Sequence, residues 1–91
     1  MSKSLKRFWF EFDINIAFNY PAGVGMGCGI TAFDIEDAYR LMDEKIFIKI
    51  KRPVIIKTIE DVNISQLDQN HIIPNMGLIF QRGIWFPLGY D

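Results

Sequence analysis

Residues 8–16 alternate strictly between two kinds of side chain, and this pattern restricts the fold more than any other feature of the chain. One set is large and apolar: Phe8, Phe10, Phe12, Ile14 and Ile16. The other set is Trp9, Glu11, Asp13 and Asn15. Successive side chains of a strand point to opposite faces of its sheet, so a period of two separates the two sets. The pattern predicts a half-buried strand over residues 8–16.

Glycine occupies every second position from Gly23 to Gly29. The start of this stretch is expected to be a loop, and residues 28–33 are expected to form a second strand beside the first. A strand with one bare face lets a large ring lie close against it, and the aromatic residues of the first strand are the expected partners. The spacing does not fit a phosphate-binding loop, because Cys28 and Ile30 stand where the dinucleotide motif needs glycine.

One amphipathic helix is predicted after Asp34, whose side chain can cap it. Apolar residues recur at helical spacing: Ile35, Ala38, Tyr39, Met42 and Ile46. The residues expected to face away are Glu36, Asp37, Arg40, Asp43 and Glu44. The first two of these lie where the helix dipole favours negative charge. Residues 46–51 fit either a short strand or the end of the helix followed by a loop, and we favour the loop.

Two more strands are expected after the helix. Pro53 ends the preceding segment, and residues 54–62 are rich in β-branched side chains, which favours a strand. Residues 78–86 are predicted to form the last strand, kinked at Gly83, and Pro87 places its end at a sheet edge.

The segments between these strands contain turn and loop residues. Residues 65–70 are expected to form a turn or one helical turn, and residues 71–77 an irregular loop. The prediction for the 91 residues is therefore a single α+β domain. A small antiparallel sheet carries one amphipathic helix, in the order β-β-α-β-β.

Composition and charge argue against several classes of protein. The net charge of −1 gives no field that would attract nucleic acid, although a basic stretch runs through residues 45–57. A single cysteine excludes an internal disulfide. No uncharged apolar run reaches the ~18 residues that a membrane span needs. Acidic residues follow the basic N-terminus too closely for a signal peptide. We expect a cytoplasmic protein that binds neither nucleic acid nor a membrane.

The chemically reactive residues do not form a recognisable site. Cys28 and His71 are each unique, and they would pair only if the loop at 71 folded over the strand at 28. The apolar neighbours of Cys28 instead favour a packed thiol. One cysteine and one histidine are a poor supply of metal ligands. Glu60 and Asp61 are strand neighbours and would point to opposite faces. We expect no catalytic residue, no metal and no cofactor.

The C-terminal segment is more aromatic than a chain end normally is. Trp85 of the last strand and Trp9 of the first are both expected on the nominally wet face of the sheet. The two rings could cover each other, or they could anchor a partner. A second candidate patch for a ligand or partner comprises His71, Asn75, Arg82 and Trp85.

Two C-terminal segments carry a resemblance. They read Asn-His-Ile-Ile-Pro-Asn-Met-Gly over residues 70–77 and Arg-Gly-Ile-Trp-Phe-Pro-Leu-Gly-Tyr over residues 82–90. Together with the strand-to-helix junction at residues 29–38, they resemble a group of small uncharacterised bacterial proteins. The resemblance covers most of the chain, implies a bacterial origin and brings no activity with it.

In size and class the chain is also similar to toxin-immunity proteins, which need surface complementarity and no catalysis. The leading hypothesis is therefore a protein-binding module, an immunity protein that neutralises a nuclease-type bacterial toxin. Its expected binding residues are Glu36, Asp37, Asp43, Glu44, Glu60 and Asp61. One alternative is a small-ligand binder or enzyme that uses the loop region from His71 to Arg82. Another is a structural subunit that self-associates through an exposed sheet edge. The oligomeric state stays open.

Overall fold

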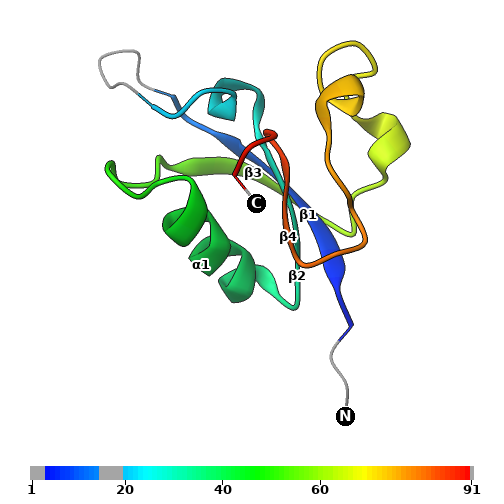
Figure 1. Cartoon of the computed structure of the whole chain (residues 1–91), viewed down its shortest axis with the longest axis horizontal. Helices are drawn as coiled ribbons and strands as arrows, with labels where there is room; N and C mark the ends of the chain where they lie inside the picture. The colour runs from blue at the N-terminus through cyan, green and yellow to red at the C-terminus, as the bar shows by residue number, and fades with distance from the viewer. Residues whose placement is uncertain (1–3, 15–19, 91) are drawn as a thin grey trace.

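A computed structural model describes residues 4–14 and 20–90 of the chain. Four strands and one helix follow one another as β1 (Lys6–Phe12), β2 (Cys28–Ala32), α1 (Ile35–Lys45), β3 (Ile55–Glu60) and β4 (Gly83–Phe86). Short 3₁₀ turns occur at Val24–Met26, Ile64–Gln66 and Ile73–Asn75. The α+β class expected from the sequence is confirmed, and Figure 1 shows the helix on one side of the sheet.

The strands form one sheet in the order β3-β1-β2-β4, and every neighbouring pair is antiparallel. The central strand β1 places Phe8 opposite Ile30 of β2 and opposite Glu60 of β3. The last strand lies at one edge of the sheet, as Pro87 indicated. Successive side chains of β1 point to opposite faces of the sheet. Phe8, Phe10 and Phe12 therefore lie on one face and Trp9 on the other.

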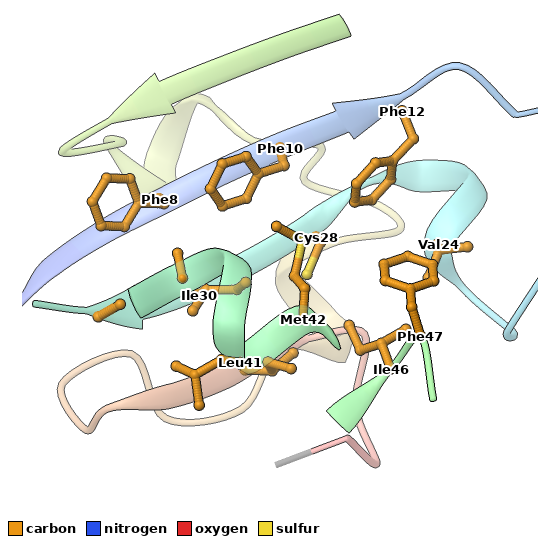
Figure 2. Packing of buried hydrophobic residues seen from close by; sticks show 13 residues of the cluster. Phe8, Phe10, Phe12, Val24, Cys28, Ile30, Leu41, Met42, Ile46 and Phe47 are labelled. Carbon is orange, nitrogen blue, oxygen red and sulfur yellow. The ribbon is translucent and has the colours of Figure 1, made fainter. Parts of the chain in front are cut away.

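The first core lies between α1 and the sheet. Figure 2 shows Phe8, Phe10 and Phe12 in a row along β1, on the side where the helix packs. The buried members of this core are Phe8, Phe10, Phe12, Val24, Cys28, Ile30, Ala32, Ala38, Leu41, Met42, Ile46, Phe47 and Ile84. The prediction of a half-buried strand is wrong on this point, because the opposite face of β1 is also covered: Trp9 is buried there and Glu11 is half-buried.

The second core covers the opposite face and contains both tryptophans, each about 1% exposed. Their rings stack with centroids 6.1 Å apart, which confirms that they cover each other. A Cβ added to Gly29 would overlap the Trp85 ring, and one added to Gly27 would overlap the Trp9 ring. Gly27 and Gly29 therefore allow close ring packing, as expected for the end of the glycine-rich stretch, although one of the two rings comes from β4 rather than from β1.

The helix begins as the sequence predicts. Asp34 accepts a hydrogen bond from the Asp37 backbone N–H at 2.8 Å, which satisfies one of the free donors of the first turn. It ends at Lys45, and no strand follows in residues 46–51. One helical position differs from expectation: Asp37 does not face away but is buried, with about 5% of its surface exposed.

The last strand is much shorter than expected, and the first begins at Lys6 and ends earlier than expected. The last one begins at Gly83 rather than at residue 78, because β2 ends at Ala32 and offers no partner beyond the pair formed by Thr31 and Gly83. The first ends at Phe12, just past its last pairing with β2. Residues 15 and 16 of the expected strand lie outside the described part of the chain.

The strand expected over residues 54–62 covers Ile55–Glu60. It ends where Asp61 adopts a left-handed backbone with φ of 53°. Residues 64–66 form the single turn that was expected near this point, and Leu67 and Ile72 then fold back onto the second core.

Candidate functional site

The acidic residues of α1 are partly neutralised by arginines of the same molecule. Arg82 Nε donates to Asp37 Oδ2 at 2.9 Å, and Arg82 Nη2 donates to Asp37 Oδ1. Arg40 Nη1 lies 3.3 Å from Asp37 Oδ1, and the Phe33 backbone N–H donates to Oδ2 at 3.1 Å. Hydrogen bonding by Arg82 is the main cause that lowers the pKa of Asp37 to about 2. The ion pair between Asp37 and Arg82 thus links the start of α1 to the segment that precedes β4.

Asp43 has an arginine partner as well. Arg52 Nη1 lies 3.3 Å from Asp43 Oδ2, and its guanidinium stacks 4.5 Å above the centroid of the Tyr39 ring. This pair remains largely in solvent, so its contribution to stability is small. Three acidic residues of α1 have exposed side chains: Glu36, Asp43 and Glu44.

Glu60 and Asp61 lie at the end of β3, and both are exposed. Glu60 is opposite Phe8, whose side chain faces α1, so Glu60 also lies on the α1 side of the sheet. The six residues expected to bind a partner therefore form two separate groups. Four lie on α1, and one of these, Asp37, is buried. The other two, Glu60 and Asp61, lie at the end of β3.

The residues of the second candidate patch lie in three different environments. His71 is exposed, with Nδ1 3.1 Å from Asp68 Oδ2, and its carbonyl accepts from Asn75 Nδ2 at 2.8 Å. Arg82 binds Asp37, and Trp85 is buried in the second core. The structure thus brings His71 and Asn75 together in one loop.

The thiol of Cys28 is buried in the first core, and desolvation raises its pKa well above the ordinary value. The loop that carries His71 packs on the opposite face of the sheet through Ile72. A thiolate–imidazole pair is therefore not formed by these two residues. Within residues 4–14 and 20–90, no cluster of three or more His, Cys, Asp or Glu side chains could hold a metal ion.

Residues 78–82 form a loop that presents large apolar side chains to solvent, so the strand predicted over this segment is wrong. Leu78 is 71% exposed and Phe80 is 78% exposed. The Thr31 hydroxyl donates to the Ile79 carbonyl at 2.6 Å, and Arg82 binds Asp37. The loop is thus anchored through its backbone at Ile79 and through the Arg82 side chain on the other side of Phe80. The one visible signal in the sequence was an apolar run without the polar alternation that a strand with one wet face needs.

An open groove of about 610 Å³ lies beyond the C-terminal end of α1. Two tyrosines, Tyr20 and Tyr90, lie on it together with apolar residues that follow the helix, and Lys45 and Lys49 add positive charge. The Tyr90 hydroxyl donates to the Ala22 carbonyl at 3.0 Å. No periodicity in the sequence could have joined Tyr20 to Tyr90, because they are brought together only by the tertiary fold.

Comparisons with protein-family models, with curated proteins and with solved structures find no match for this chain. In the part of the chain that the structure describes, no helix is long and apolar enough to cross a membrane.

Proposed function

We propose that the protein is a non-catalytic protein-binding module of the bacterial cytoplasm, an immunity protein that binds and neutralises a nuclease-type toxin. The observation that supports the proposal most is the exposed Phe80 on a loop that hydrogen bonds anchor on either side of it. This side chain is 78% exposed, and hydrogen bonds at Ile79 and Arg82 hold the loop on either side of it.

The anchored loop is pre-organised for binding. A binding loop loses less conformational entropy when its backbone is already held in the free protein. A large apolar side chain contributes most of its binding energy when it fills a pocket at the centre of an interface. Leu78 and Phe80 are each more than two-thirds exposed on this loop, which leaves both side chains available to fill such a pocket of a partner.

Charge supports the same kind of partner. The loop is joined to the start of α1 through Asp37, and Glu36 is exposed beside that residue. Asp43 and Glu44 extend the acidic surface along the helix. A nuclease that binds a phosphate backbone carries a basic cleft, so these carboxylates would speed association and fix orientation. The inhibitor would then act by covering the cleft, a role that needs no chemistry of its own.

The test uses the toxin domain encoded next to the gene for this protein as the binding probe. We expect the wild-type chain to capture that domain, and Phe80→Ser to weaken binding at least tenfold because a central aromatic anchor contributes more than about 1.4 kcal/mol. Ile48→Ser is the matched control, since Ile48 is 69% exposed but lies after the helix. It should leave the affinity unchanged.

Two outcomes would contradict the proposal. One is the absence of any toxin domain that is encoded nearby and binds the wild-type chain. The other is equal loss of binding in both variants, which would assign the effect to general surface apolarity rather than to the loop over residues 78–82.

A further inference from the structure

The open groove of about 610 Å³ beyond the C-terminal end of α1 has no part in the proposed function, and its walls are supported from inside the molecule. Ile46 is buried in the first core, and Ile50 packs against that core. Tyr90 packs there as well, and its hydroxyl donates to the Ala22 carbonyl at 3.0 Å. Figure 1 shows the red C-terminal end returning toward this end of the helix. A groove of this volume with supported walls has the size of a small-molecule site.

The walls of the groove are largely apolar. Isoleucine occupies every second position from Ile46 to Ile50, and all three isoleucines line the groove. Ile46 is buried and Ile50 is half-buried, whereas Ile48 is 69% exposed. The rings of Tyr20 and Tyr90 add aromatic surface. A ligand with an apolar body would therefore remove apolar surface from water here, which favours binding.

The charged residues that line the groove, among the described residues, are two lysines. Lys45 and Lys49 are both exposed, and neither takes part in an ion pair within the described part of the chain. A cation at Lys45 suits the negative end of the α1 dipole. This effect falls off within the last turn of a helix, so it does not account for Lys49, which lies beyond α1. Two ammonium groups beside an apolar surface are complementary to an anion.

We propose that this groove binds a small amphiphilic anion, a molecule with an apolar body and one carboxylate or phosphate head. The body lies on the isoleucine and tyrosine side chains, and the head pairs with Lys45 and Lys49. A neutral apolar ligand would leave both ammonium groups unpaired, and a cationic ligand would be repelled by them. Lysine is a compact point charge without the planar fork of arginine, so it does not select between the two kinds of head.

This inference does not depend on the proposed function. The loop over residues 78–82 is joined to the start of α1 through Asp37 and Arg82, whereas the groove lies beyond the end of the helix. The groove is also open to solvent, so a simple ligand should bind weakly and exchange rapidly.

Octanoate is the probe, with octanol as the neutral body and acetate as the isolated head. Backbone amide chemical shifts of the purified full chain are recorded as each compound is added. We expect saturable binding of octanoate, with the largest shift changes in residues 45–50. Octanol should bind roughly fivefold more weakly, as expected for the loss of an exposed ion pair. Acetate should give no saturable change, because it has no apolar body.

Two pairs of variants separate the charge from the apolar walls. Lys49→Gln should weaken octanoate binding about threefold and leave octanol binding unchanged. Lys57→Gln is its matched control, because Lys57 is an exposed lysine on β3 that does not line the groove. Ile48→Ser should weaken the binding of both compounds. Ile56→Ser should weaken neither, since Ile56 is 65% exposed but lies outside the groove.

A separate measurement distinguishes a free anion from a membrane lipid. The chain is centrifuged with phosphatidylglycerol vesicles, and we expect it to stay in the supernatant. Co-sedimentation would assign the lysines and isoleucines to a bilayer surface and overturn the proposal. Octanoate that does not bind saturably, or that binds no better than octanol, overturns it as well. So do shift changes that lie outside the groove, or equal effects of Lys49→Gln and Lys57→Gln.

Discussion

Gly29 shows how one backbone position supports the second core. The Trp85 ring lies directly against its Cα, and both tryptophans of this face are buried. A side chain there would have to displace a large ring that stacks on Trp9. Close-packed interiors absorb such a change poorly, because a rigid ring has no alternative rotamer within the same space.

We therefore expect Gly29→Ala to lower the free energy of unfolding by about 1–3 kcal/mol, as overpacking of a core generally does. Gly25→Ala is the control: no atom lies within 4 Å of a Cβ built at Gly25. That variant should be close to neutral. Urea denaturation followed by tryptophan fluorescence measures both, and equal stability of the two variants would show that the ring packing against Gly29 does not matter.

Asp37 joins two elements that are distant in sequence. Its carboxylate accepts from Arg82 and from the Phe33 backbone, and these contacts connect the loop over residues 78–82 to the start of α1. The pKa of Asp37 is lowered to about 2, chiefly by the Arg82 hydrogen bond. A carboxyl whose pKa is lower in the folded than in the unfolded chain stabilises the fold above the unfolded pKa, and that stability is lost as pH falls.

The expected window for this loss lies between about pH 4 and pH 2, from the ordinary pKa of 3.8 down to that of the folded chain. Its size is at most about 2 kcal/mol, since Arg82 is partly in solvent and screened. Asp37→Asn should remove this part of the pH dependence and destabilise the protein at pH 7. Asp43→Asn, whose pair with Arg52 is exposed, should do neither. Urea titrations at pH 7 and pH 3 make the comparison, and a wild-type acid response retained in Asp37→Asn would contradict this account.

At the scale of elements, the features set by nearby residues were predictable. The Asp34 cap and the β-β-α-β-β sequence of elements follow from capping, periodicity and turn residues, whereas the helix end was predicted only to lie between residues 45 and 51. The burial of Asp37 was not predictable, because its helical position is consistent with a solvated face. Its burial depends on Arg82, which lies 45 positions away.

The candidate site was less predictable than the fold. Glu36, Asp43 and Glu44 are exposed as the helical pattern indicated. Leu78 and Phe80 were assigned to a strand, because their sequence is apolar enough for one. They do not form a strand because β2, the neighbouring strand, already ends at Ala32. The local sequence of residues 78–82 does not reveal where that neighbour ends.

At the scale of the whole molecule, the two faces of the sheet have different roles. The helix covers one face and carries exposed acidic residues, while the long connection between β3 and β4 covers the other face over the tryptophans. The exposed apolar loop over residues 78–82 immediately precedes β4 at one edge of the sheet, and β3 forms the opposite edge. One can therefore be altered without altering the other.

The most direct measurement of the central claim is inhibition of the neighbouring toxin domain in a nuclease assay. The wild-type chain should abolish cleavage once it reaches equal molar amounts with the toxin. Phe80→Ser should require a large excess, whereas Ile48→Ser should behave like the wild type. Unchanged cleavage in the presence of excess wild-type protein would contradict the account.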